Sequence, residues 1–140
     1  TAFMAMKYNE PLLEDIYQNY ITKAVAETGF EVDLLKDVLQ AGSIDDQLRI
    51  QIRRAKFLIA DLTHDNNGAY WEAGFAEGLN KQVIYSCKRS VFDDPKTKPH
   101  FDTNHLTTVT WEKDTINEDM KKLKAIIRNT FPAEAQLEDK

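Results

Sequence analysis

The chain has 140 residues, with 18 Lys and Arg against 23 Asp and Glu, and a net charge of -5. This length suits one domain with a sizeable core, and a negative charge without a basic cluster argues against a protein that binds duplex nucleic acid. The single cysteine, Cys87, excludes a disulfide framework and a cysteine-based metal site, so we expect a reducing, cytoplasmic compartment, no metal and no cofactor. No apolar run is long enough for a membrane span or a signal peptide.

The first part of the chain contains residues that typically begin or end a helix. Pro11 suits the first turn of a helix and Gly29 suits its end, while Ser43 is a candidate N-cap. Apolar periodicity between these signals predicts a strand, a helix, an edge strand and a helix, over residues 2–6, 11–28, 30–34 and 43–55. Because Thr1 leads directly into the first strand, we expect the chain to be a fragment of a longer protein.

The central stretch, residues 57–85, has the pattern of a strand, a turn, a helix and a second strand. An apolar run at 57–60 ends on Asp61, a polar turn follows, and a helix is predicted from 69 to 79 before the apolar run at 83–85. Such a unit forms a right-handed crossover between parallel strands, and ligands of open parallel sheets bind at the carboxyl ends of the strands. Asp61 lies at that end.

Glu72 interrupts an otherwise apolar stripe of this helix, formed by Ala69, Phe75, Ala76 and Leu79. In the predicted helix it occupies the first turn, where the helix dipole favours an ionised nucleophile or an anion-stabilising group. The alternative is that an acid at this position only stabilises the start of the helix.

The last part of the chain predicts a loop, a strand and a helix. Residues 86–104 are polar and contain two prolines, so we expect a loop over the carboxyl edge of the sheet, followed by a strand at 106–111. Thr115 and Glu118 match a capping box for a helix that Pro132 ends, and the tail 133–140 is expected to be disordered. Five strands alternating with four helices predict one α/β domain over residues 1–132. Its doubly wound, five-stranded parallel sheet has the flavodoxin-like order 2-1-3-4-5, with helices on both faces.

The apolar positions of these elements also predict which side chains form the core. We expect burial of Phe3, Ala5, Leu13, Ile16, Val32, Leu48, Ile52, Leu58, Ile59, Phe75, Val83, Ile84, Val109, Leu123 and Ile127.

After the first strand, this chain lacks the residues that two common functions of this fold require. A phosphoacceptor receiver domain needs an acidic pair there to hold magnesium, whereas this chain has Met6, Lys7 and Tyr8. A flavin or dinucleotide site needs a loop rich in glycine, serine and threonine at the same place. The function must therefore be inferred from the central stretch.

That stretch resembles the signature of the nucleoside 2-deoxyribosyltransferase-like superfamily and of its bacterial TIR-like relatives. The resemblance is carried by IADLT at 59–63, NN at 66–67, YWEAGFA at 70–76 and the run from Gly78 to Ile84. It is specific between about residues 43 and 84 and weaker at 101–104. Ala73 replaces a usual leucine and Gln82 a usual proline, and the loop after the first strand has no close match to the transferases.

The resemblance implies chemistry at an N-glycosidic bond. One carboxylate stabilises or traps the oxocarbenium-like state while a second group protonates the departing base. By resemblance the nucleophile is Glu72. The second acid falls on Asp46, with Asp45 as the alternative register, and protonates or orients the leaving base.

Further site residues follow from the same resemblance. Asp61 belongs to the catalytic acids and, with Asn66, holds sugar hydroxyls or the base edge, and Tyr8 positions the nucleophile. Asp102 and Asn104 match a loop that completes a neighbouring subunit's site in the transferases, which implies a homo-oligomer.

Other residues have two interpretations each. Lys7 binds a substrate phosphate or is a solvated lysine, and Trp71 stacks a base or belongs to the core or an interface. Gly74 and Gly78 permit close packing of another subunit or of the helix on its own sheet. His64 and His105 are expected to be surface residues, because no motif supplies a nucleophilic partner for them.

We therefore expect an N-glycosidase or N-glycosyltransferase that acts on a nucleoside, a nucleotide or NAD, as an effector domain of a bacterial defence or toxin system. The alternative, from another class, is a non-catalytic nucleotide-sensing module. The expected partners are a small-molecule substrate, further copies of the chain and further domains tethered to it.

Overall fold

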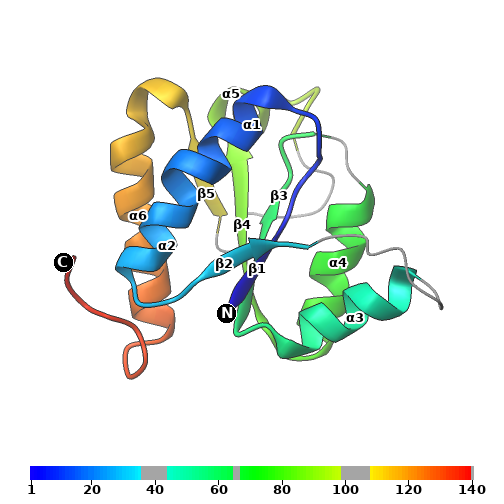
Figure 1. Ribbon diagram of the computed structural model, residues 1–140. Helices are drawn as coiled ribbons and strands as arrows, with labels where there is room; N and C mark the ends of the chain where they lie inside the picture. Colours follow the sequence, from blue (N-terminus) through cyan, green and yellow to red (C-terminus); the bar gives the residue numbers. More distant parts are fainter. Residues whose placement is uncertain (36–43, 65–66, 99–107, 140) are drawn as a thin grey trace.

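The computed structural model describes residues 1–35, 44–64, 67–98 and 108–139. Its sheet is parallel throughout, with five strands in the order β2-β1-β3-β4-β5 (Figure 1). The strands are β1 (Ala2–Ala5), β2 (Val32–Leu34), β3 (Phe57–Asp61), β4 (Gln82–Lys88) and β5 (Thr108–Trp111). The predicted doubly wound fold with strand order 2-1-3-4-5 is confirmed.

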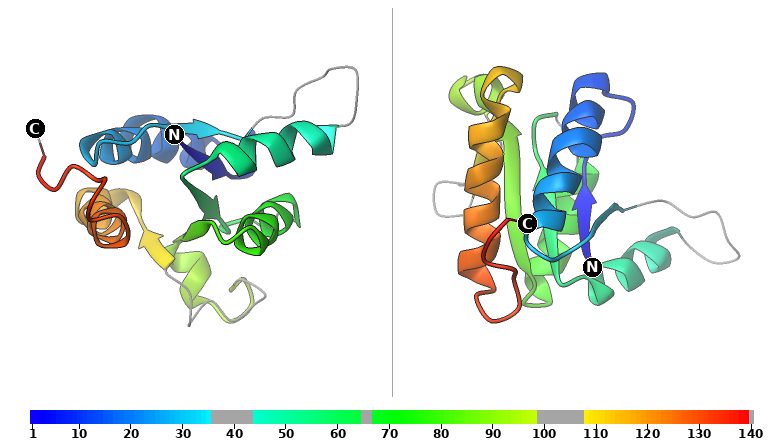
Figure 2. Two further views of the ribbon diagram at one scale, coloured as in Figure 1. Left: turned by 90° about the horizontal axis from the view of Figure 1, so that it is seen from below. Right: turned by 60° about the vertical axis from the view of Figure 1, so that its left-hand side comes forward.

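Helices cover both faces of the sheet (Figure 2). One layer contains the first helical segment and the last helix, and the other layer contains the two helices of the middle of the chain, so each face has its own apolar cluster. The helices are α1 (Pro11–Ile16), η1 (Tyr17–Ile21), α2 (Thr22–Glu27), α3 (Ile44–Arg54), α4 (Asn67–Gly78), α5 (Arg89–Asp93), η3 (Lys113–Thr115) and α6 (Ile116–Thr130).

The first helical segment is continuous from Pro11 to Glu27, as predicted, but its middle part, η1, is a π-helix. The segment ends where the sequence indicates, because Gly29 has a φ of 88°, in the left-handed region that glycine adopts without steric cost.

The predicted core is confirmed with three partial exceptions. Phe3, Phe75 and Val83 are only partly buried, and the other predicted core residues are buried. The largest fully buried side chains also include Trp111, Tyr85 and Phe57, which the prediction omitted.

The segment after β4 differs from the predicted loop. β4 continues to Lys88 and is followed at once by α5, so residues 86–93 are regular structure. The polar side chain of Ser86 is tolerated inside the sheet because its hydroxyl donates a hydrogen bond to Asp61 on the neighbouring strand.

The start of α6 does not form the predicted capping box. The Thr115 hydroxyl donates to the Asp119 carboxylate at 2.8 Å, and Glu118 pairs with Lys121 instead of reaching back to the helix start. Asp119 is 1% exposed and also receives hydrogen bonds from Arg89 and from the Glu112 backbone N–H. A buried acid one position further along therefore organises this helix end.

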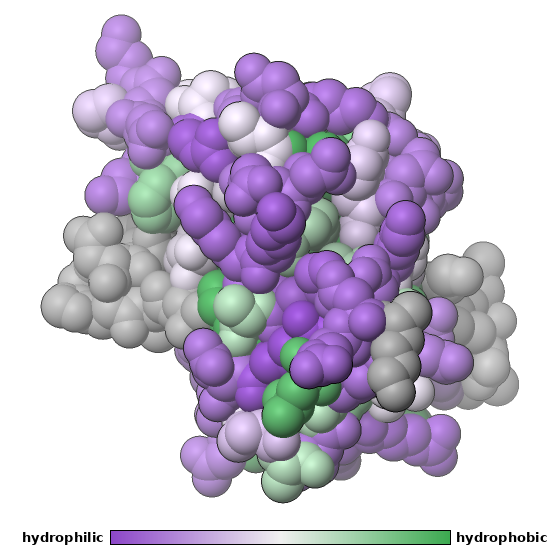
Figure 3. All heavy atoms as spheres, turned by 90° about the vertical axis from the view of Figure 1, so that its left-hand side faces the viewer, coloured by the Kyte–Doolittle hydropathy of each residue, from purple (hydrophilic) through white to green (hydrophobic). Residues whose placement is uncertain are grey.

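The expectation of a disordered tail is wrong for residues 133–139. The Gln136 backbone N–H donates to the Thr28 carbonyl at 2.7 Å, and Asp139 pairs with Lys124 at 2.6 Å and with Arg128 at 2.7 Å. Hydrogen bonds from these two cations lower the pKa of Asp139. The face that includes α6 and the tail exposes mainly hydrophilic side chains (Figure 3). Polar contacts with distant residues thus order a segment that has little to bury.

Candidate functional site at the carboxyl edge of the sheet

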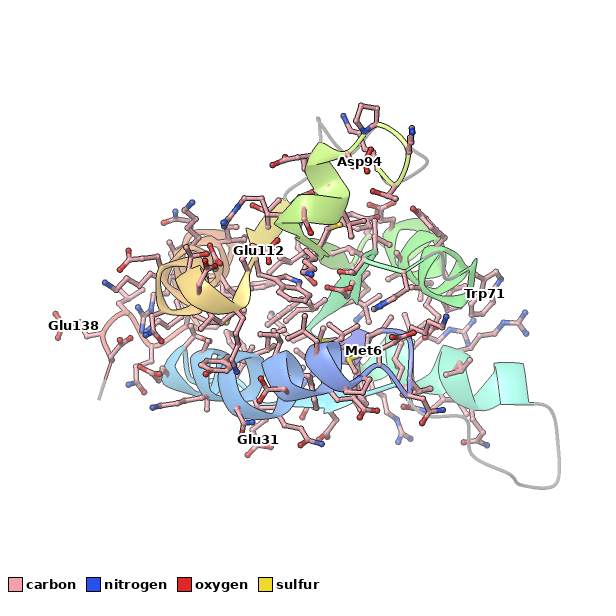
Figure 4. The ribbon with its side chains drawn as sticks, turned by 90° about the horizontal axis from the view of Figure 1, so that it is seen from above. Met6, Glu31, Trp71, Asp94, Glu112 and Glu138 are labelled. Atoms are coloured by element: carbon pink, nitrogen blue, oxygen red, sulfur yellow. The ribbon has the colours of Figure 1, made fainter. Side chains whose placement is uncertain are left out.

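The carboxyl ends of β1, β3 and β4 meet at one edge of the sheet (Figure 1). Lys7 and Tyr8 follow β1, and Asp61 is the last residue of β3. This edge is where ligands of doubly wound sheets bind, because loops and helix starts converge there. Figure 4 looks down on the edge, with Met6 at the end of β1 near its centre.

Asp61 is a buried acid at this edge that accepts three hydrogen bonds. Its Oδ2 accepts hydrogen bonds from the Ser86 hydroxyl at 2.7 Å and from Trp111 Nε1 at 3.0 Å, and its Oδ1 accepts one from the Thr63 backbone N–H at 2.9 Å. The residue is 1% exposed. The carboxylate therefore links β3, β4 and β5, and because it is buried, contact with a sugar would require this network to open.

The turn after β3 is tied to β4 by a second polar contact. The Thr63 hydroxyl accepts a hydrogen bond from the Lys88 backbone N–H at 2.9 Å, where β4 ends and α5 begins. Together with Asp61 this contact fixes the direction in which the chain leaves the sheet before α4.

Cys87, between these anchors on β4, is fully buried. Burial, with the Asp61 carboxylate as the second cause, raises the pKa of its thiol to about 12. At pH 8 the native thiolate fraction is then on the order of 10⁻⁴, so labelling by a disulfide reagent is expected to be at least about 100-fold slower than in urea. Absorbance of the released reagent measures both rates, and equal rates in the two conditions would contradict this environment.

Glu72 lies in the second turn of α4, not in the first. The helix begins at Asn67, two residues earlier than the sequence predicts, and its first turn contains no acid. The argument from the helix dipole is therefore wrong for Glu72, since that effect decays within the first turn. Glu72 is partly buried, at the border of the face on which Ala69, Ala73 and Ala76 are buried.

Trp71 lies on the outer side of α4 and is 42% exposed (Figure 4). Its indole stacks on Phe75 with ring centroids 5.5 Å apart, and the guanidinium of Arg49 from α3 lies 5.8 Å from the indole centroid. The arrangement favours the packing interpretation of Trp71 over a role in stacking a base at the carboxyl edge.

Gly74 and Gly78 are exposed, and a Cβ at either position would meet no described atom within 4 Å. Packing of α4 on its own sheet therefore does not explain these glycines, and that interpretation is wrong.

Lys7 and Tyr8 are exposed after β1. The Lys7 ammonium lies 3.5 Å from Glu10 Oε1, and Nε2 of His64 lies 3.4 Å from Glu10 Oε2. Glu10 belongs to no motif of the sequence, and His64, which was expected at the surface, is 27% exposed. No local signal identifies the pair, because the two residues come from different strand–helix connections.

Several predicted site residues lie outside the described part of the chain. They are Asn66, Asp102 and Asn104. Asp45 and Asp46 lie in the first turn of α3, but their side chains also lie outside it.

Among residues 1–35, 44–64, 67–98 and 108–139, no group of three His, Cys, Asp or Glu side chains is arranged to hold a metal ion. No helix in these ranges has the length and apolar character that crossing a membrane requires. A groove of about 250 Å³ runs between η1 and α2 on one side and α6 on the other, and is lined by Asn19, Lys23 and Lys121 among others.

Neither a family model nor a curated protein matches the sequence of this chain.

Proposed function

We propose that this chain is an N-glycosidase or N-glycosyltransferase that acts on a nucleoside, a nucleotide or NAD, with Glu72 as the nucleophile. The observation that supports it most is the placement of a partly buried carboxylate early in α4, the helix that follows β3 at the carboxyl edge of the sheet. The resemblance of residues 59–84 to the nucleoside 2-deoxyribosyltransferase-like superfamily supports the same proposal.

The proposed reaction has two steps. A Glu72 oxygen attacks C1′ of the sugar while the C1′–N bond breaks and its electron pair leaves with the base. Water, or a second base, then attacks C1′ and releases the carboxylate. Asp46, with Asp45 as the alternative, orients or protonates the base. Lys7, which follows β1 at the carboxyl edge of the sheet, is suited to bind a substrate phosphate.

A biological role follows as part of the proposal. An enzyme that cleaves nucleotides or NAD can deplete them, which suits the effector domain of a bacterial defence or toxin system. In the proposed homo-oligomer, the segment with Asp102 and Asn104 completes the site of a neighbouring subunit. The exposed Gly74 and Gly78 are compatible with such packing.

A nucleotide-sensing module is the second candidate. The observation that favours it is the burial of Asp61 in a hydrogen-bond network inside the sheet, which removes one of the three proposed catalytic acids from solvent. Such a module would keep ligand binding without turnover.

Chromatography of released base tests the proposal directly. NAD, ribonucleosides, deoxyribonucleosides and their monophosphates are incubated with the wild type, Glu72→Ala and Glu72→Gln. Base release by the wild type is expected to fall by about 10⁴-fold or more in both variants, because they remove the nucleophile itself.

Glu77→Gln is the matched control on the same helix. Glu77 is exposed and accepts a hydrogen bond from the Tyr85 hydroxyl, which glutamine also accepts, so this variant should keep wild-type release. A covalent glycosyl adduct, seen by intact mass only when Glu72 is present, would identify the nucleophile. Ligand binding without release in the wild type would instead favour the sensing module.

A further inference from the structure

The groove between η1 and α2 on one side and α6 on the other has no part in the proposed reaction. Its volume is about 250 Å³. The helices around it pack on the apolar cluster of one face of the sheet, whereas α4, which carries Glu72, packs on the cluster of the opposite face (Figure 2). A ligand in this groove would therefore be separated by the sheet from the helix of the proposed nucleophile.

Buried apolar side chains line part of the groove. Ala24 of α2 and Met120 of α6 are 3% and 7% exposed, and Tyr20 of η1 packs against the same apolar cluster. The rest of the lining is polar. An apolar surface with a few polar groups around it is typical of sites for small molecules. Because the volume lies slightly below the usual range of about 300–1,000 Å³, the ligand is expected to be small.

One wall of the groove contains the π-helical turn. Asn19 and Tyr20 belong to η1, at the end of which the Thr22 backbone N–H donates to the Tyr17 carbonyl, five residues back. Such turns are rare inside helices and occur frequently at functional sites. A ligand that uses this wall would explain why the helical segment contains the turn.

Lysines line the groove from both sides. Lys23 lies on α2, and Lys121 and Lys124 lie on α6, while Glu27 is the one acid of the lining among the described residues. Lys23 is exposed and forms no ion pair within this part of the chain. The local excess of cations contrasts with the net charge of -5 of the whole chain. An anion in the groove would be attracted from both walls.

The two lysines of α6 retain donors for such an anion. The Lys124 ammonium contacts Glu27 at 3.3 Å and Asp139 at 2.6 Å, which leaves one of its three N–H donors. Lys121 pairs with Glu118, but the two side chains are 68% and 70% exposed, so this surface pair contributes little and a ligand can replace it.

We propose that this groove binds a small organic anion, a molecule with a compact apolar body and one carboxylate or phosphate group. The apolar body packs on Met120 and Tyr20, and the anionic group is held by Lys23 and Lys121. The contact of Asp139 with Lys124 shows that an ammonium group of this lining already accepts a carboxylate as its partner. The inference does not depend on the proposed function.

The test uses probes of similar size that differ in charge. Phenyl phosphate, benzoate and the uncharged benzyl alcohol are titrated into the full chain at low ionic strength, and amide chemical shifts in nuclear magnetic resonance spectra give both the affinity and the location. At least one of the two anions should bind with a Kd of about 1 mM, as expected for ligands of this size, and shift the amides of residues 19–27 and 117–124. Benzyl alcohol should bind at least about tenfold more weakly. The anion that binds more tightly identifies the charged group.

Three variants locate the anionic group. Lys23→Gln and Lys121→Gln should each raise the Kd of the anion about threefold to tenfold. Lys122→Gln is the matched control, because Lys122 is an exposed lysine of α6 that does not line the groove. It removes the same charge and should leave the Kd within about twofold of the wild-type value. Thermal unfolding verifies that each variant is folded.

Several outcomes would overturn this inference. They are the absence of binding by both anions, equal binding of benzyl alcohol, and an equal effect of Lys122→Gln and Lys23→Gln. Binding that is lost in Lys7→Gln and kept in Lys23→Gln would place the anion at the carboxyl edge instead. The assay of base release decides the proposed function separately, so binding in the groove without release would support this site and refute the glycosidase.

Discussion

Replacing Asp61 with alanine is expected to lower the free energy of unfolding by about 3–5 kcal/mol. The change leaves the Ser86 hydroxyl, the Trp111 indole N–H and the Thr63 backbone N–H without their acceptor in a site that is 1% exposed. Since a domain of this size has a total stability of about 5–15 kcal/mol, the loss is a large part of it. Equilibrium unfolding in urea, followed by far-ultraviolet circular dichroism, measures the difference.

The chemical cause of this loss can be separated from loss of volume. Asp61→Asn keeps the shape but turns one acceptor into a donor, so at least one of the three donors faces an N–H group and about 1–3 kcal/mol is lost. In a double-mutant cycle, Asp61→Ala and Trp111→Phe should be strongly non-additive, because they remove two ends of one hydrogen bond.

Asp33→Ala is the matched control, an exposed aspartate on β2, and should change stability by less than about 0.5 kcal/mol. If the free energy of unfolding of Asp61→Ala were within about 1 kcal/mol of the wild-type value, the buried network would contribute little to stability. Asp61 would then be available to contact a substrate.

Phe57→Ala is expected to cost about 3–5 kcal/mol through the loss of buried area and the cavity it leaves. Phe57 is fully buried at the start of β3, where its ring lies edge-on to Phe30 and stacked on Phe131, both with centroids 5.4 Å away. The three rings join the sheet to the loop before β2 and to the end of α6. Thermal and urea unfolding measure the loss.

Leu12→Ala serves as the comparison for this prediction, because Leu12 is 39% exposed on α1. Leu12→Ala should lower the free energy of unfolding by less than about 1 kcal/mol, since removing an exposed side chain leaves no cavity. Similar losses in both variants would mean that the aromatic cluster is loosely packed.

The candidate site was only partly predictable. The sequence placed Asp61 at a strand end and Glu72 on the following helix, because a strand, a polar turn and a helix are local patterns. It misplaced the start of α4 by two residues, which moved Glu72 out of the first turn, because the polar residues before Ala69 can belong to a turn or to a helix. Element boundaries depend on such small differences in local preference.

The outward position of Trp71 was not decided by helical periodicity alone. α4 carries apolar residues around most of its circumference, so periodicity does not single out one buried face. Contact with the guanidinium of Arg49 from α3 holds the rings of Trp71 and Phe75 on the side of α4 next to α3, where Trp71 stays exposed, and not over the sheet edge.

The sequence by itself determined the alternation of strands and helices and most of the core, because these follow from the local period of apolar residues and from end signals. The parallel sheet and its order were expected from that alternation through the right-handed crossover and the common doubly wound arrangement. Only the tertiary structure decided which polar groups meet. The β3–β4 register sets Ser86 beside Asp61, β5 brings Trp111 to the same carboxylate, and the β1–α1 connection brings Glu10 to His64. These partners are distant in the chain, so their encounter depends on strand register and helix packing, which no local pattern encodes.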